Sequence, residues 1–160
     1  MNNGRTLDVM IVPVGGLPYR RTLEADRDGS FLHGLQTCVG GPIEPADYIF
    51  EDAPAVYVNE EGLLGASLET ANRAIYATKQ MAELGYLSQM DYSHAVEEGE
   101  LYSIVFGEMV CVGFDPGTGE DRDINDAEAE RVVERFGSDE SVMSGGLELI
   151  RTMLRSQAAG

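Results

Sequence analysis

Two apolar runs separated by only two residues constrain the fold more than any other feature of this chain. Residues 101–106 (LYSIVF) and 109–114 (MVCVGF) flank Gly107-Glu108, and both runs are rich in β-branched and aromatic residues. A two-residue connection with glycine first is typical of a type II′ turn between antiparallel strands. The pattern therefore predicts a β-hairpin at 101–114, and with it an antiparallel sheet.

A second hairpin is expected near the N-terminus, where a buried strand at 7–14 is followed by Gly15-Gly16 and a returning strand at 19–24. Apolar residues at helical spacing predict helices, and the helix expected at 127–136 begins with a capping box of Asn125 and Glu128. The segment 86–100 is interpreted as a long loop or as a small helix that starts near Ser93. The other expected elements are strands at 48–51, 55–58 and 63–64 and helices at 30–39, 70–84, 127–136 and 146–155.

Strands in hairpins, interrupted by helices of varied length, favour an α+β fold. The length of the chain, 160 residues, is enough for one domain with a substantial core. We therefore expect a single α+β domain over residues 1–160, with a mostly antiparallel sheet built from hairpins and helices packed on one face.

The charge of the chain bounds its partners. Asp and Glu number 28 against 11 Lys and Arg, a net charge of −17. Residues 81–160 hold 17 acids and 5 bases (net −12), whereas residues 1–80 hold 11 acids and 6 bases (net −5). Such a surface repels nucleic acid and anionic membranes and attracts basic partners. We expect no direct nucleic-acid binding and no membrane binding.

The C-terminal half is therefore expected to present an acidic, partner-binding face. A second interpretation is that the excess of Asp and Glu reflects a GC-rich or salt-adapted host, in which the charge serves only solubility. The residues expected on the face are Asp115, Glu120, Asp121, Asp123, Asp126, Glu128, Glu130 and Glu134.

No residue pattern indicates a catalytic, metal or cofactor site. His33 and His94 are the only histidines, and no cysteine pair has zinc-binding spacing. The pair Cys111 and His94 stays open as a nucleophile and base, but two buried, reduced thiols and a surface histidine are the favoured interpretation. We expect no enzymatic activity, no metal and no cofactor. The chain contains no apolar run of about 18 residues and no signal-peptide pattern, which predicts a cytoplasmic location.

Two groups of polar residues are candidates for a small ligand. Arg20 and Arg21 form the one basic pair near the N-terminus. Asn72, Arg73 and Tyr76 fall at one end of the expected helix 70–84, where they are able to offer amide, guanidinium and hydroxyl donors. The alternative for the second group is a hydrogen-bond network that ties the helix to the sheet.

Four motifs, in this order, resemble the domain-of-unknown-function family numbered 3846. The resemblance covers a core of about 7–137 and leaves the expected C-terminal helix at about 146–155 outside it. Members of this family are small proteins of phages, plasmids and conjugative elements, with no established activity. The motifs are Leu35-Gln36-x-x-Val39-Gly40-Gly41-x-Ile43-Glu44, Asn59-Glu60-Glu61-Gly62, Asn72-Arg73-Ala74-Ile75-Tyr76, and Phe106-Gly107 followed after five residues by Gly113.

The charge and the resemblance together suggest a non-enzymatic accessory protein of a phage or mobile element. We expect it to bind a basic, nucleic-acid-binding host protein as a DNA mimic does, in an anti-restriction or anti-defence role. The main alternative is a small-ligand or nucleotide-binding protein that uses Arg73, Arg20 and Arg21.

Overall fold

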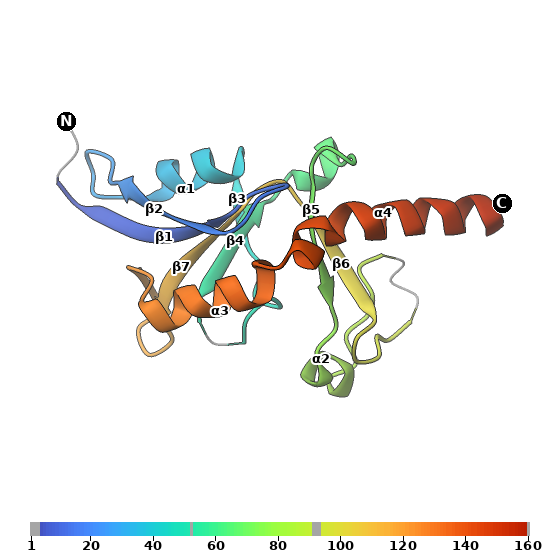
Figure 1. The fold of residues 1–160 in the computed structure, drawn as a ribbon. Helices are drawn as coiled ribbons and strands as arrows, with labels where there is room; N and C mark the ends of the chain where they lie inside the picture. The colour runs from blue at the N-terminus through green and yellow to red at the C-terminus, as the bar shows by residue number, and fades with distance from the viewer. Residues whose placement is uncertain (1–3, 52, 91–93, 160) are drawn as a thin grey trace.

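The computed structural model describes residues 4–51, 53–90 and 94–159 (Figure 1). The α+β prediction is confirmed, because strands in antiparallel sheets are combined with helices. In chain order the elements are β1 (Thr6–Val12), β2 (Tyr19–Glu24), α1 (Leu32–Val39), β3 (Ile43–Pro45), β4 (Ala55–Asn59), the 3₁₀ helix η1 (Gly62–Gly65), β5 (Ala71–Tyr76), α2 (Lys79–Glu83), β6 (Leu101–Phe106), β7 (Met109–Asp115), β8 (Glu120–Arg122), α3 (Asp126–Phe136) and α4 (Asp139–Ala159).

The larger sheet has the strand order β2-β1-β7-β4-β3, and β8 pairs with the end of β7. All of these pairings are antiparallel. The N-terminal hairpin is confirmed, with β1 and β2 in register from Thr6 opposite Glu24 to Ile11 opposite Tyr19.

The hairpin predicted at 101–114 is wrong. Strand β6 pairs with β5 in a separate two-stranded sheet, whereas β7 lies between β1 and β4. Gly107 does adopt the positive φ (87°) that its position suggested. Its N–H, however, donates to Thr70 O (2.8 Å) and its carbonyl accepts from Asn72 Nδ2 (2.9 Å). Because both backbone groups of Gly107 bond to the β5 side, the chain passes from one sheet to the other.

The central strands β1 and β7 of the larger sheet are buried on both faces over most of their length, which corrects the expectation that helices pack on one face. Alternate residues of β1 enter two cores, as the period of a strand requires. Leu35, Cys38 and Val39 of α1 pack with one set, which includes Val9 and Ile11. The other set, which includes Met10 and Val12, packs against α3 residues Ala129, Val132 and Phe136. In Figure 1 the two helices accordingly lie on opposite sides of the sheet.

The helix predicted at 70–84 is also wrong: the segment forms β5 and then the five-residue α2. Every residue from Ala71 to Ile75 is buried. Apolar residues at helical spacing in this segment therefore do not distinguish a helix from a strand that is buried on both faces. Thr78 accepts a hydrogen bond from Met81 N (3.2 Å) and starts α2 only after the strand has ended.

Other boundaries differ in detail. Residues 48–51 form a loop between β3 and β4 rather than a strand, and Leu63 and Leu64 lie in η1, 75% and 84% exposed. The C-terminal helix begins at Asp139 rather than 146. The described part of 86–100 is a loop with an isolated bridge between Leu87 and Ala95, and the helix start expected near Ser93 lies outside the described residues.

Candidate interaction surface

Helix α3 displays a row of carboxylates on its outer side. Its first turn is fixed by the predicted capping box, in which Asn125 accepts from Glu128 N (2.8 Å) and Glu128 accepts from Asn125 N (3.1 Å). Asp126, Glu130 and Glu134 follow at spacings of four and are all exposed. At about 1.5 Å of rise per residue, they form a row about 12 Å long.

Glu128 does not belong to this row, which corrects its place on the expected acidic face. Its side chain is 5% exposed and forms an ion pair with Arg122, with Nη1 2.7 Å and Nη2 3.2 Å from its two oxygens. Desolvation by burial acts to raise the pKa of Glu128, but the hydrogen bonds from Arg122 and from the backbone N–H of Asn125 outweigh it and hold that pKa below its usual value.

Further exposed acids lie in and beside the β7–β8 turn. Asp115 accepts from Gly117 N (2.9 Å), which shapes the turn, and Glu120 follows at the start of β8. The Tyr57 hydroxyl donates to both oxygens of Asp121 (2.9 and 3.0 Å). Burial raises the pKa of Asp121 and also that of Tyr57. Asp123 accepts from Asp8 N (2.8 Å), so it joins β1 to the entry of α3.

We call the exposed acids of α3 and of the β7–β8 region together the acidic surface; Asp121, which is bonded to Tyr57, lies on the α1 side of the sheet, opposite the row along α3. Within the described residues, only Asp126 among them forms an ion pair, with Arg20 at 2.8 Å. Exposed carboxylates without a cation partner keep their charge available to a second molecule, and an exposed pair such as Arg20–Asp126 is weak and easily exchanged. The members are Asp115, Glu120, Asp121, Asp123, Asp126, Glu130 and Glu134, all of them exposed.

A groove of about 510 Å³ runs between the start of β2 and α3, at one edge of the acidic surface. Apolar atoms of Met10, Pro18 and Val133 line it, together with the acidic side chains Glu130 and Glu134. A lysine or arginine side chain combines an apolar stem with a cationic head. The groove therefore offers both kinds of contact that such a side chain needs.

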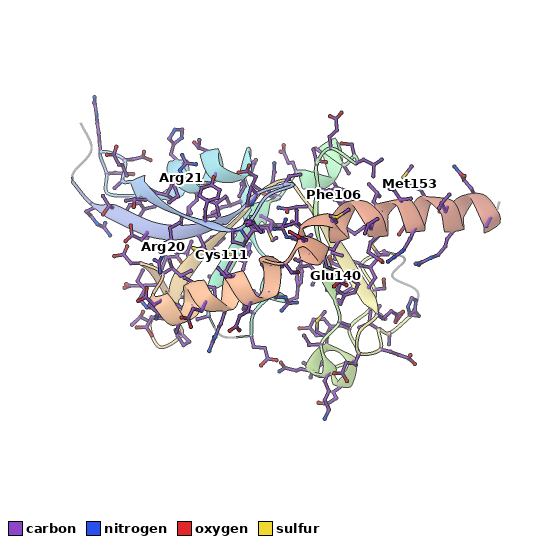
Figure 2. The ribbon with its side chains drawn as sticks, viewed as in Figure 1. Arg20, Arg21, Phe106, Cys111, Glu140 and Met153 are labelled. Atoms are coloured by element: carbon purple, nitrogen blue, oxygen red, sulfur yellow. The ribbon has the colours of Figure 1, made fainter. Side chains whose placement is uncertain are left out.

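Arg20 and Arg21 do not form a common site. They are neighbours on β2, so their side chains leave on opposite faces of the sheet, as Figure 2 shows. Arg20 borders the groove beside α3, whereas Arg21 lines a different hollow with Gly34 and Thr37 of α1. The interpretation of the two as a ligand-binding pair is corrected.

Asn72 and Arg73 are fully buried, which corrects their place in a ligand site. Asn72 Nδ2 donates to Val12 O (2.8 Å), and its Oδ1 accepts from Arg73 Nη1 (2.7 Å). Arg73 Nη1 also donates to Pro13 O (3.1 Å), and Nη2 donates to Gly16 O (2.7 Å) and to Phe136 O (2.9 Å). The pair therefore connects β5 to β1, to the β1–β2 turn and to the end of α3.

The hydrogen-bond network that we gave as the alternative interpretation of Asn72 and Arg73 is therefore present, although it starts from a strand rather than from a helix. Burial lowers the pKa of Arg73 to about 10, so the guanidinium is still charged at neutral pH. Its acceptors are four uncharged oxygens, and Arg73 Nε is buried without a partner in the described part of the chain. Tyr76, at the end of β5, is exposed and has no part in this network.

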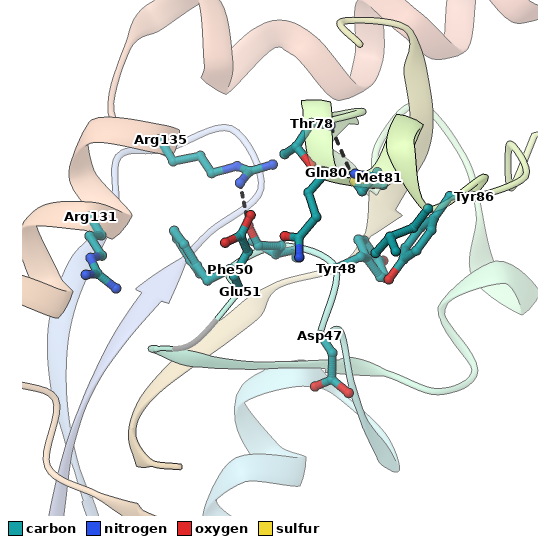
Figure 3. A pocket seen from close by; sticks show the side chains of 12 residues that line it. Asp47, Tyr48, Phe50, Glu51, Thr78, Gln80, Met81, Tyr86, Arg131 and Arg135 are labelled. Atoms are coloured by element: carbon teal, nitrogen blue, oxygen red, sulfur yellow. Dashed lines mark hydrogen bonds between the residues drawn. The ribbon is translucent and has the colours of Figure 1, made fainter. Parts of the chain in front are cut away.

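A cleft of about 460 Å³ between α3, the loop 47–51 and α2 was not anticipated from the sequence (Figure 3). Arg131 and Arg135 reach it from successive turns of α3 and donate to the carbonyls of Ala53 (2.6 Å) and Ile49 respectively. The guanidinium of Arg135 lies over the ring of Phe50, 5.7 Å from its centroid. The spacing of four between the two arginines is visible in the sequence. The loop that completes the cleft is not, because the sequence predicts a strand at 48–51.

Further lining residues give the cleft a mixed character. Tyr48 and Tyr86 line the side away from α3, and both contact Tyr102: the Tyr48 ring is tilted against it at a centroid distance of 5.1 Å, and the Tyr86 ring meets it edge to face at 5.9 Å. The acidic residues Asp47 and Glu51 also line the cleft, and in Figure 3 the Asp47 side chain points away from the two arginines.

The two cysteines are free and buried, as predicted. Burial raises the pKa of Cys111 to about 12 and also raises that of Cys38, so both thiols are protonated at neutral pH. His94 is partly exposed and lies 2.7 Å from Glu100. Over the described residues, no three His, Cys, Asp or Glu side chains are grouped to hold a metal ion. None of the described helices has both the length and the apolar character that a membrane span requires.

The model of one known protein family matches most of this chain. The model of the family described as Domain of unknown function (DUF3846) matches residues 6–137. The chain belongs to this family. No curated protein and no solved structure matches the chain. The matched region contains both sheets and ends where α3 ends, so α4 lies beyond the DUF3846 match.

The motifs that carry the family resemblance serve architecture. Asn59 accepts from Glu61 N (2.8 Å) to form the turn after β4. A Cβ atom on Gly41 would lie 2.8 Å from Asn59 Oδ1, so the glycine allows the end of α1 to approach this turn. Asn72, Arg73 and Gly107 form the junction of the two sheets. In this DUF3846 protein these motifs therefore hold parts of the fold together.

Proposed function

We propose that the protein binds a basic, nucleic-acid-binding protein through the acidic surface and competes with DNA for it. The observation that carries the proposal is a set of seven exposed carboxylates with a single ion pair, Arg20–Asp126. Double-stranded DNA presents about one charge per 1.7 Å of its axis, and its partners contact it through arginine and lysine. Ordered carboxylates attract the same cations.

The groove beside α3 supports a partner that uses lysine or arginine side chains. Its apolar wall, including Val133, accepts the stem of such a side chain while Glu130 and Glu134 meet the charge. The class of partner that we propose is a host restriction or defence protein, because the family resembled here is one of phages and mobile elements. No catalysis is required of this protein in that role.

The test begins with capture of partners by the full-length protein from its own host, followed by titration with the purified partner. We expect the partner to bind DNA on its own and to release DNA when this protein is added. Binding should weaken steeply between about 50 and about 500 mM salt, because charges on both surfaces are screened. Equal binding at both salt concentrations would contradict the proposal.

A charge-matched pair of variants separates a defined surface from general acidity. The variant E120Q/E130Q/E134Q removes three charges from the acidic surface, and the control E44Q/E61Q/E69Q removes three exposed charges elsewhere. We expect the first to weaken binding about tenfold or more and the control to change it little. Equal losses in both would favour acidity that serves solubility alone.

We assign the alternative function, binding of a nucleotide or a similar anion, to the cleft beside α3 rather than to the arginines that the sequence suggested. Arg20, Arg21 and Arg73 do not converge, whereas Arg131 and Arg135 share the cleft with Tyr48 and Tyr86. Each arginine donates there to one backbone carbonyl, and the described residues contain no carboxylate in ion-pair distance of either. Arginine forks and aromatic rings are the groups that recognise phosphates and bases.

A thermal-shift panel of nucleoside mono-, di- and triphosphates tests this alternative. A nucleotide that binds the cleft raises Tm increasingly with its concentration relative to Kd, and Arg131→Gln should remove the rise. Arg27→Gln, which changes an exposed arginine of the β2–α1 loop, is the control and should keep it. No rise with any nucleotide, or a rise that Arg131→Gln leaves intact, would contradict nucleotide binding in the cleft.

A further inference from the structure

Helix α4 packs on the small sheet through one side only. Ser144, Gly145 and Glu148 are buried on that side, and Ser144 Oγ accepts from Ala74 N of β5 (2.9 Å). The opposite side faces away from the protein, and the C-terminal half of the helix extends past the rest of the fold (Figure 1). Figure 2 places Met153 on this projecting half.

The outward side carries a continuous apolar stripe. Met143, Leu147, Ile150 and Leu154 are 59%, 41%, 41% and 58% exposed. Their spacings of four, three and four place them within about 60° of one another around the axis, at 100° per residue. This is the pattern of one seam of a coiled coil, in which such residues pack against a second helix.

The stripe is complementary to itself when two copies run antiparallel. With a two-fold axis between Leu147 and Ile150, Met143 of one copy faces Leu154 of the other, and Leu147 faces Ile150. The same alignment brings Glu140 within about two residues, or about 3 Å along the axis, of Arg155 of the other copy. A parallel pair would instead place like charges side by side, so the charges select the antiparallel arrangement.

The charge of α4 also distinguishes it as a place for a second copy. Helix α4 contains three acids and two bases, a net charge of −1, whereas residues 1–138 contain 25 acids and 9 bases, a net charge of −16. Two copies of so acidic a protein repel each other over most of their surfaces. The helix is the segment on which apolar contact is available with little repulsion.

From the stripe, its self-complementarity and its local charge, we propose that α4 pairs with α4 of a second copy to form an antiparallel, two-fold symmetric dimer. An interface of this kind is isologous, so every contact occurs twice. The pairing uses the side of α4 remote from the small sheet, and it leaves the acidic surface of each copy free.

Sedimentation over a range of protein concentrations tests the dimer. We expect a species of twice the monomer mass of 17.3 kDa, and we expect Leu147→Glu to weaken association at least about tenfold, because it places a charge in the apolar stripe. Leu64→Glu changes a leucine of η1 that is more exposed, and it should leave the dimer intact. Circular dichroism and Tm of each variant report whether the fold is retained.

Salt dependence distinguishes this contact from the acidic surface. Added salt screens the repulsion between two highly negative copies, so the dimer should strengthen from about 50 to about 500 mM salt, whereas partner binding weakens. A protein that sediments as a monomer at every concentration and salt, or a dimer that Leu147→Glu does not weaken, would overturn the proposal. Failure to find a basic partner has no bearing on it.

Engineered cysteines test the orientation. In the antiparallel pair, a variant with both Met143→Cys and Leu154→Cys should form disulfides between copies, because each new cysteine faces its counterpart. Met143→Cys alone should not, since the two copies of residue 143 are then about 16 Å apart and a disulfide spans at most about 7 Å between Cα atoms. The native thiols are buried and do not interfere. Cross-linking of the single variant would indicate a parallel pair and contradict the proposal.

Discussion

At the residue scale, charged groups of this protein divide by burial rather than by position in the sequence. Glu128 lies between exposed acids, yet it is buried and paired with Arg122, whereas its helical neighbours Asp126 and Glu130 face solvent. Arg73 is buried among backbone carbonyls rather than carboxylates. Backbone carbonyls from several segments together hold the guanidinium of Arg73. A lysine at this position would lose the forked set of N–H donors that the guanidinium provides.

The Glu128–Arg122 pair should make stability depend on pH. The folded-state pKa of Glu128 lies below its ordinary value of 4.5, so the ionised pair stabilises the fold above that pH and the contribution is lost as pH falls through the folded-state pKa. We expect Glu128→Gln to lower the free energy of unfolding by about 1–3 kcal/mol at pH 7, because a charge-assisted bond is lost.

Urea unfolding of wild type and Glu128→Gln at pH 7 and at about pH 3.5 measures this difference, which should shrink at the lower pH. Glu130→Gln removes an exposed carboxylate from the same helix, and it should alter stability at pH 7 by no more than about 0.5 kcal/mol. A difference between wild type and Glu128→Gln that is equal at both pH values would show that the ion pair does not supply it.

At the scale of elements, close packing of α4 on β5 depends on one glycine of an adjacent pair. A Cβ atom on Gly145 would lie 2.7 Å from the backbone carbonyl of Asn72 and 3.0 Å from the N of Arg73. A Cβ atom on Gly146 would have no neighbour within 4 Å. The helix therefore approaches the strand at a distance that only glycine permits at position 145.

The two glycines form a matched test. Gly145→Ala should destabilise the protein by about 2 kcal/mol, because the helix must move away from β5. Gly146→Ala should stabilise it by about 0.5–1 kcal/mol, because alanine favours the helical backbone. Thermal or urea unfolding measures both, and a loss of equal size in the two variants would contradict this account of the contact.

At the scale of the whole molecule, the net charge of −17 is distributed over two sheets and several loops, with exposed acids also on β3, on either side of η1 and in the loop before β6. What distinguishes the acidic surface is therefore its order, in a row along α3 beside a groove, rather than the presence of acids. Helix α4 is the nearly neutral exception. The partner binding and the self-association that we propose therefore use separate regions, and we expect opposite responses to salt.

Local patterns were sufficient for the parts of the fold that local physics controls. The N-terminal hairpin and the capping box of α3 were predictable, because each depends on residues a few positions apart. The predicted helix at 70–84 is wrong because β5 is buried on both faces, so its apolar residues do not show the alternation that identifies a half-exposed strand.

Pairings and burial of single charged groups were not predictable in this way. The separation of β6 from β7 depends on Asn72 and Thr70, which bond to Gly107 from more than thirty residues away in the chain. The cleft required the loop 47–51 to meet α3, and the hydrogen bonds of Arg73 required three distant segments to converge.

The amino-acid sequence by itself thus determined the class of fold, the family and the sign of the charge that a partner meets. Tertiary structure alone decided which carboxylates remain exposed, which arginines are structural, and which apolar residues of α4 are left uncovered. The physical reason is that composition and short-range spacing act through local conformation, whereas desolvation and ion pairing depend on which distant segments pack together.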